Sequence, residues 1–214
     1  MIDSNFLKLN TNSTLNVSRE TLDELDEYSN EIIKRNKNIN LISKSSENVI
    51  KSRHIQDSAQ TIDFIDKNDI KICTDLGSGA GLPGIVLGIL MKSKSPLFKV
   101  IFYEKSYHKS IFLKEMSKKF QLNSEIKQKN IFNEENLVTD VIISRAFKPL
   151  PIIFEIAIKN FKYFKYIILF LGKSGKKILD DAFKIWQFDY EEKKSLTSNE
   201  SIVVKIFNLK KRNG

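Results

Sequence analysis

The sequence predicts an α/β domain whose mostly parallel sheet is covered by helices on both faces. From residue 70 onward, short apolar runs alternate with segments whose apolar residues recur at helical spacing. The first run leads into residues 75–84 (DLGSGAGLPG), where four glycines lie within eight positions before a second apolar run. Such a run of glycines is typical of a tight strand-to-helix turn whose backbone approaches a ligand closely.

Two helices are predicted before this turn. Ser18 can cap the first, whose apolar residues follow at helical spacing until the asparagines of residues 36–40 interrupt it. The second is predicted over residues 46–65. We therefore expect residues 1–66 to form a helical extension packed on a core of residues 67–214.

The core is expected to contain seven strands and four helices. Helices are predicted after the glycine-rich turn (85–90) and over residues 107–120, 149–161 and 174–186. The strands are predicted over residues 70–73, 97–103, 124–127, 140–144, 166–171, 190–196 and 201–209, the last two in hairpin order. Strands that alternate with helices in this way imply a mostly parallel sheet.

Composition limits the classes of function. The 214 residues include 35 Lys and Arg against 26 Asp and Glu, a net charge of +9 that favours a polyanionic partner. The one cysteine, Cys73, and the two histidines give no cluster with zinc spacing and no internal disulfide, so we expect no metal and a reducing cytoplasm. We identify neither a signal peptide nor an apolar run long enough to span a membrane.

Two overlapping glycine patterns suggest different cofactors. Gly79, Gly81 and Gly84 spell the dinucleotide pattern GxGxxG, and Gly77, Gly79 and Gly81 spell GxGxG with Asp75 two residues ahead. Glu104, at the end of the next predicted strand, suits a ribose in either case. A carboxylate at Asp75 suits the ammonium of a methionine moiety and would repel a pyrophosphate, which favours S-adenosylmethionine over a nicotinamide dinucleotide. A glycine turn without a ligand is the structural alternative, and the GK[ST] ending of a Walker loop is missing.

Five segments spread over the chain resemble the RsmG (GidB) family of class I methyltransferases. They are residues 36–41 (NKNINL), 53–58 (RHIQDS), 75–84, the Lys109, Phe112 and Leu113 set, and residues 144–147 (SRAF). Three positions depart from the family pattern: Arg35 replaces a tryptophan, Ile131 a glutamate, and Gly172–Lys173 a Lys-Gly pair. The resemblance implies a Rossmann-like class I S-adenosylmethionine-dependent methyltransferase fold.

This resemblance also implies methylation of N7 of one guanosine in 16S ribosomal RNA, guanine 527. The glycine-rich turn, the acidic strand end and the family pattern together give these expected cofactor residues: Asp75, Gly77, Ser78, Gly79, Gly81, Leu82, Glu104, Asn130, Ile131 and Arg145. Ile131 has no acceptor side chain, so either backbone groups contact the adenine or Glu134 lies nearer to it.

Methylation at guanine N7 needs no general base, because the nitrogen carries a lone pair and no proton. The enzyme has to align nucleophile, methyl carbon and sulfur and exclude water. We hypothesise that Arg145 is the catalytic residue and lines the site against cofactor or target nucleotide; the alternative is a surface arginine. His54 and Asp57 lie one helical turn apart, and we favour a buried structural pair over a direct substrate role.

The predicted partner is 16S ribosomal RNA or the small ribosomal subunit, held by phosphate contacts, with the protein acting as a monomer. The expected RNA-binding residues are Arg35, Lys37, Arg53, His54, Lys148 and Lys173, with Lys34, Lys176 and Lys177 as further candidates. The alternatives are a methyltransferase acting on another RNA base, a protein or a small molecule, an NAD(P)-binding oxidoreductase, and a non-catalytic S-adenosylmethionine sensor that binds RNA.

Overall fold

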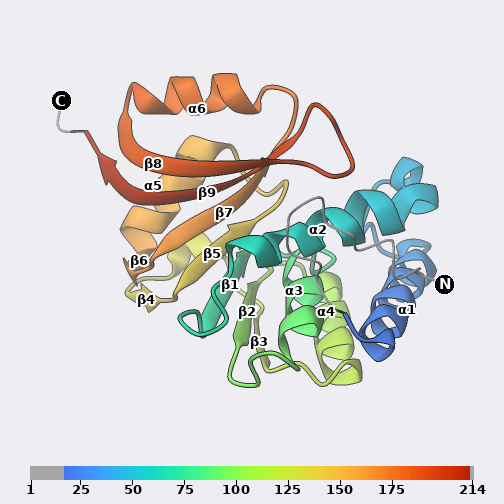
Figure 1. Cartoon of the computed structure of the whole chain (residues 1–214). Helices are drawn as coiled ribbons and strands as arrows, with labels where there is room; N and C mark the ends of the chain where they lie inside the picture. The colour runs from blue at the N-terminus through green and yellow to red at the C-terminus, as the bar shows by residue number, and fades with distance from the viewer. Residues whose placement is uncertain (1–16, 213–214) are drawn as a thin grey trace.

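Seven strands form one sheet in the order β3-β2-β1-β5-β7-β9-β8 in the computed structural model, which describes residues 17–212 (Figure 1). β1 (Ile72–Leu76), β2 (Lys99–Tyr103), β3 (Ser124–Lys127), β5 (Val141–Ser144) and β7 (Tyr166–Leu171) run parallel. β9 (Ile202–Lys211) is antiparallel to both β7 and β8 (Trp186–Lys194). The predicted mostly parallel sheet and closing hairpin are confirmed. From β1 the chain adds β2 and β3 on one side of the sheet and then β5 and β7 on the other. Ligands of such sheets bind at the point where the order of addition reverses, which lies beside β1.

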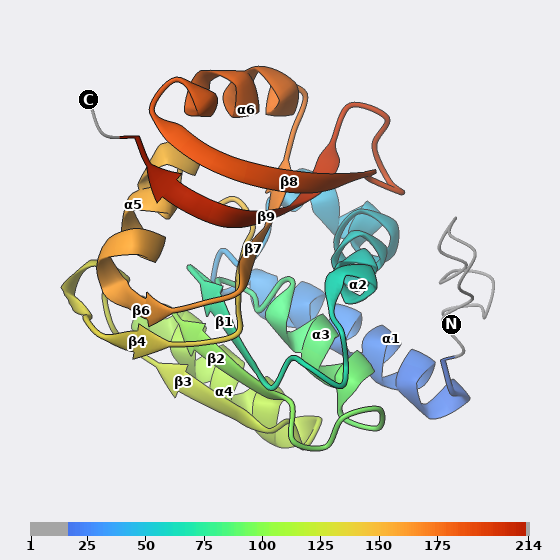
Figure 2. The same ribbon diagram turned by 60° about the vertical axis from the view of Figure 1, so that its left-hand side comes forward.

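Both faces of the sheet are buried, because neighbouring residues of a strand enter different cores. In β5, Val141 and Ile143 belong to one hydrophobic cluster and Ile142 to the other. The first cluster packs α3 (Gly84–Met91) and α4 (Tyr107–Lys119), and the second packs α5 (Leu150–Asn160) and α6 (Gly175–Phe183). Figure 2 shows these two pairs of helices on opposite sides of the sheet. This arrangement leaves the carboxyl ends of the central strands open for a ligand.

The N-terminal helices pack on the α3 side of the sheet. α1 (Arg19–Asn36) is capped by Ser18 as predicted, because the Ser18 hydroxyl accepts a hydrogen bond from the Thr21 N–H. The second predicted helix is instead four short pieces: the 3₁₀ helix η1 (Lys44–Val49), the π-helix η2 (Lys51–Gln56), α2 (Asp57–Ala59) and the 3₁₀ helix η3 (Gln60–Phe64). Side-chain hydroxyls compete here for backbone carbonyls, as Ser46 does at Ser43 and Thr61 at Ser58. Residues 1–16 of the predicted extension lie outside the described residues.

Four smaller features differ from the prediction. β1 extends to Leu76, so that Asp75 lies inside the strand, and β8 already starts at Trp186, which packs against Phe154. A separate two-stranded sheet joins β4 (Leu137–Val138) to β6 (Phe161–Tyr163), and a 3₁₀ helix, η4 (Ile131–Asn133), precedes it. Within residues 17–212, no helix is long and apolar enough to cross a membrane.

Candidate active site

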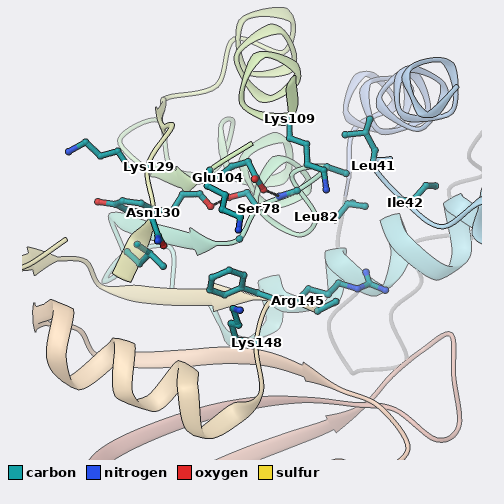
Figure 3. A pocket seen from close by; sticks show the side chains of 18 of the residues that line it. Leu41, Ile42, Ser78, Leu82, Glu104, Lys109, Lys129, Asn130, Arg145 and Lys148 are labelled. Carbon is teal, nitrogen blue, oxygen red and sulfur yellow. Dashed lines mark hydrogen bonds between the residues drawn. The ribbon is translucent and has the colours of Figure 1, made fainter. Parts of the chain in front are cut away.

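A cavity of about 730 Å³ opens at the carboxyl ends of β1, β2 and β5. Figure 3 shows its wall built from segments far apart in the sequence, with Asn130 and Lys129 at one end and Leu41 and Ile42 at the other. The lining residues are Leu41, Ile42, Ser43, His54, Gly77, Ser78, Gly79, Ala80, Leu82, Tyr103, Glu104, Lys105, Lys109, Lys129, Asn130, Ile131, Phe132, Arg145, Ala146, Phe147 and Lys148. All of the predicted cofactor residues except Asp75 and Gly81 are among them.

The glycine-rich turn needs glycine at defined positions. Gly77, Gly79 and Gly81 have φ values of +67°, +56° and +85°, in the left-handed region that favours glycine. A Cβ atom at Gly77 would lie 2.1 Å from the Phe147 ring, which packs directly on the turn. The Gly77 N–H donates to the Tyr103 carbonyl at 2.9 Å and joins the turn to the end of β2. The turn is therefore held in one shape from both sides.

Asp75 lies beneath the turn and does not line the cavity. Its carboxylate is buried, Oδ2 accepts a hydrogen bond from the Gly84 N–H at 3.0 Å, and Oδ1 has no partner within the part of the chain described. Burial raises the pKa of Asp75 to about 7; the Gly84 N–H opposes this shift and the Glu104 carboxylate adds to it. In this structure the carboxylate bonds to the last residue of the turn instead of to a ligand space.

Glu104 lines the cavity at the end of β2. Its Oε2 accepts a hydrogen bond from the Gly79 N–H at 2.9 Å and its Oε1 one from the Ser106 N–H at 2.8 Å. These two bonds fix the carboxylate at the edge of the glycine-rich turn. Each oxygen retains a further lone pair, so the group can also accept hydrogen bonds from two neighbouring hydroxyls.

Residues 130–134 form the far wall. The Asn160 amide donates to the Ile131 carbonyl at 2.8 Å and to the Glu134 carbonyl at 2.5 Å, and so ties this segment to α5. Asn130 and Ile131 line the cavity, whereas Glu134 does not and pairs with Lys129 at 3.1 Å. The geometry therefore favours Ile131 and its neighbours over Glu134 at this end.

Arg145 connects two of the predicted family segments. Its Nη1 donates to the His54 carbonyl and to Ser58 Oγ, both at 3.4 Å, and its Nη2 donates to the Arg53 carbonyl at 2.8 Å. Nη2 also pairs with Asp57 Oδ2 at 3.0 Å, and the guanidinium lies 5.0 Å from the Phe170 ring centroid. The side chain is 16% exposed, so the alternative of a surface arginine is wrong. In Figure 3 it runs from the cavity wall toward the helical segment that carries residues 53–58.

No hydrogen bond joins His54 to Asp57 in the described residues, and each side chain has other partners. His54 Nε2 lies 3.0 Å from Ser46 Oγ, and His54 Nδ1 is buried without a partner among residues 17–212. Asp57 instead binds Arg145, Gln60 and Ser195. The two side chains therefore belong to different hydrogen-bond networks, and His54 lies in the π-helical turn whereas Asp57 begins α2.

The state of His54 leads to a prediction about acid stability. Burial lowers the pKa of His54 to about 4, and the nearby Arg145 and Arg53 charges lower it further. Because the folded pKa lies below the usual 6.5, the stabilising contribution is fully present above pH 6.5 and is lost as the pH falls toward 4. Between pH 7 and pH 5 the wild type should lose about 1 kcal/mol more unfolding free energy than His54→Gln, allowing for solvent screening.

Urea unfolding of both proteins at the two pH values measures this difference. Asp75, whose pKa is raised, contributes in the opposite direction, and its contribution cancels because it is present in both proteins. Equal losses for the wild type and His54→Gln would contradict a buried neutral imidazole.

The N-terminal extension supports the turn through Tyr28. The buried Tyr28 hydroxyl donates to the Ala80 carbonyl at 2.5 Å, and Ala80 lines the cavity. Tyr28→Phe leaves that carbonyl without its donor, and we expect the unfolding free energy to fall by about 1–2 kcal/mol. Chemical denaturation measures the loss. Tyr107→Phe, at an exposed tyrosine, is the control and should change stability by less than about 0.5 kcal/mol.

The predicted RNA-binding residues are not gathered at one place. Lys148 and His54 line the cavity, and Lys37 and Arg53 are exposed. Arg35 pairs with Glu115, Lys176 with Glu192, and Lys173, 80% exposed, with Glu200 at 2.7 Å, so these cations already have acidic partners. Three lysines that we did not assign to the site, Lys105, Lys109 and Lys129, line the cavity instead. Their place just after β2 and β3, at the same sheet edge as Glu104, is the signal that could have identified them.

Residues 41–43 form a third wall that was also missed as a cavity element. Asn36 Oδ1 accepts hydrogen bonds from the Leu41 and Ile42 N–H groups at 2.8 and 3.0 Å, and its amide donates to Glu47 at 2.6 Å. These bonds close the connection after α1 so that Leu41, Ile42 and Ser43 face the cavity. In the described residues no group of three His, Cys, Asp or Glu side chains is placed to hold a metal ion.

A seven-stranded sheet of this order, with a glycine-rich turn after β1 and an acidic residue at the end of β2, defines the Rossmann-like fold of S-adenosylmethionine-dependent methyltransferases. Residues 21–204 match the family model described as rRNA small subunit methyltransferase G. The chain belongs to this family. A ribosomal RNA small subunit methyltransferase G of Pelagibacter ubique is 48% identical over 200 residues, which cover 92% of this chain and 93% of the relative. One from Rickettsia akari is 35% identical and covers 92% and 99%.

Solved structures support the fold at low sequence identity. The 16S rRNA methylase RmtB matches with a TM-score of 0.53 and 10% identity, covering 89% of this chain and 75% of its own. The PH0226 protein of Pyrococcus horikoshii matches with a TM-score of 0.55 and 13% identity, covering 83% and 98%. These similarities concern the fold alone.

Proposed function

We propose that this protein transfers a methyl group from S-adenosylmethionine to N7 of guanine 527 in 16S ribosomal RNA. The observation that carries the proposal is the cavity itself. In a chain of this family, it joins the glycine-rich turn and the Glu104 carboxylate to a basic, partly aromatic wall. A guanine ring and a charged phosphate backbone would find complementary groups on that wall.

The residues of the cavity fit an adenosyl group with a methionine tail. Glu104 would accept hydrogen bonds from the ribose hydroxyls, and the Asn130–Ile131 segment would lie against the adenine. Gly77, Gly79 and Leu82 would contact the tail, and the missing Cβ at Gly79, where no side chain fills the space, would allow it to approach closely. Asp75 would contribute by holding the turn through its hydrogen bond from the Gly84 N–H rather than by direct contact. When bound, this cofactor supplies an electrophilic methyl group on a sulfonium.

The protein groups around the cavity suit an N7 acceptor. Guanine N7 attacks with its lone pair and releases no proton, so no general base is required there. His54, the histidine in the wall, has a pKa of about 4 and stays neutral at pH 7. The protein then has to align the base with the methyl group and to exclude water. A cavity walled by protein groups suits both tasks.

One experiment tests the reaction and its position. The protein is incubated with labelled methyl donor and small ribosomal subunits from a strain that lacks this methylation, and the modified base is mapped. We expect label at N7 of guanine 527 and none on subunits already modified. Label at another atom or base would correct the acceptor, and RNA without label would contradict the proposed function.

Calorimetric titration tests the cofactor separately. We expect heat with S-adenosylhomocysteine and none with NADH. The opposite pattern would support the oxidoreductase alternative and overturn the cofactor assignment.

A further inference from the structure

The Asp57 carboxylate lies where three segments distant in the sequence meet. Its Oδ2 pairs with Arg145 Nη2 at 3.0 Å, and its Oδ1 accepts hydrogen bonds from Gln60 at 2.6 Å and from Ser195 Oγ at 2.8 Å. Ser195 follows β8 at the tip of the closing hairpin, 138 residues away in the sequence. Both carboxylate oxygens therefore have partners in a buried position.

The Arg145 guanidinium is bound by protein groups at the cavity wall. Its Nη1 and Nη2 groups hold His54, Ser58, Arg53 and Asp57, and its face covers Phe170. These contacts use the four N–H bonds of the two terminal nitrogens. These contacts therefore fix the side chain and, with it, the backbone that carries Arg145 beside the cavity.

That backbone is strained where it meets the cavity. Ala146 has a φ of +52°, a left-handed conformation that costs a non-glycine residue about 1–2 kcal/mol. The next residue, Phe147, packs on Gly77, and Ala146, Phe147 and Lys148 all line the cavity. Strain of this kind persists only where surrounding contacts hold it, and here the Arg145 contacts hold the chain before Ala146 while the Phe147 packing holds it after.

We propose that Asp57 is a positioning residue for methyl transfer. It fixes Arg145, and through Arg145 it holds residues 146–148 against the glycine-rich turn, while the Ser195 hydroxyl makes the β8–β9 tip part of this support. The expected effect on the rate of methyl transfer rests on the proposed function. The expected effect on the order of residues 144–148 does not depend on the substrate. We expect the charge of Asp57 to matter more for this support than its volume. The Asp57–Arg145 ion pair is buried, and removing the carboxylate charge leaves Arg145 without that counterion.

Asp57→Asn and Ser195→Ala test this role, with Ser201→Ala as the matched control. Ser201 lies in the same turn and bonds Ser198 rather than Asp57. We expect kcat to fall about 10- to 100-fold in Asp57→Asn and about 3- to 10-fold in Ser195→Ala, with the affinity for S-adenosylhomocysteine changed less than about 3-fold. Ser201→Ala should behave as the wild type. The milder Ser195→Ala variant keeps the test valid if Asp57→Asn fails to fold.

Two readouts separate positioning from general destabilisation. If Asp57 acts through Arg145, the double variant Asp57→Asn/Arg145→Ala should be no slower than Arg145→Ala alone, whereas independent roles would multiply. Hydrogen exchange of residues 144–148 should accelerate in Asp57→Asn and Ser195→Ala and not in Ser201→Ala, whatever the substrate. Unchanged exchange or multiplied kinetic losses would overturn the inference, and a wild type without RNA methylation would contradict only the proposed function.

Discussion

Glu104→Ala is expected to weaken cofactor binding by about 100-fold or more, which corresponds to about 3 kcal/mol. The carboxylate is held at the cavity edge by the Gly79 and Ser106 N–H groups, with lone pairs left for the ligand. Two hydrogen bonds from ribose hydroxyls to a carboxylate are charge-assisted and account for a loss of this size. Calorimetric titration with S-adenosylhomocysteine measures it.

Glu134→Gln is the matched control for this experiment. Glu134 is an acidic residue of the neighbouring segment, but it pairs with Lys129 and does not line the cavity. We expect its affinity to stay within about 3-fold of the wild type. Because Glu104→Ala also removes the acceptor of the Gly79 N–H, its thermal midpoint is measured alongside. If the affinity for S-adenosylhomocysteine were unchanged in Glu104→Ala, or fell equally in Glu134→Gln, Glu104 would not be the acceptor for the ribose hydroxyls.

The fold could be predicted because its signals are local. A continuous apolar run in residues 140–144 and helical spacing in residues 107–120 each depend on neighbours within a few positions, and the structure confirms both elements. The segment 46–65 could not be predicted in detail, because its helix is divided by side chains such as Ser46 that bond to the backbone. The β4–β6 pair consists of strands of two and three residues, too short for a periodic pattern.

The candidate site was predictable where it depends on the strand ends, and not where it depends on long-range contacts. Gly77 and Glu104 follow β1 and β2, so sheet topology brings them together. The direction of the Asp75 side chain is set by burial within β1, and its position before the glycines carries no information on that direction. The Arg145–Asp57 pair joins two residues that are far apart in the sequence. The sequence indicates only that both residues belong to family segments.

The glycine-rich turn allows strain and steric exclusion to be measured separately by three substitutions. Gly79 has a φ of +56°, and a Cβ there would meet only a backbone oxygen at 3.8 Å, so Gly79→Ala introduces strain alone. Gly172 has neither a positive φ nor any atom within 4 Å of an added Cβ, so Gly172→Ala introduces neither effect. We expect Gly79→Ala to cost about 1 kcal/mol of unfolding free energy and Gly172→Ala to be neutral within about 0.5 kcal/mol.

Gly77→Ala combines both effects and should cost about 3 kcal/mol or more, with cofactor affinity falling beyond the range of calorimetry. The new Cβ would lie 2.1 Å from Phe147 Cδ2, and the ring cannot retreat without disturbing the strained Ala146 beside it. The second substitution in Gly77→Ala/Phe147→Ala removes the colliding ring, so the double variant should recover stability relative to Gly77→Ala while the strain at residue 77 remains. Denaturant unfolding of the series decides this. Equal losses in Gly77→Ala and Gly79→Ala would mean that the Phe147 ring does not press on the turn and that backbone strain alone requires glycine there.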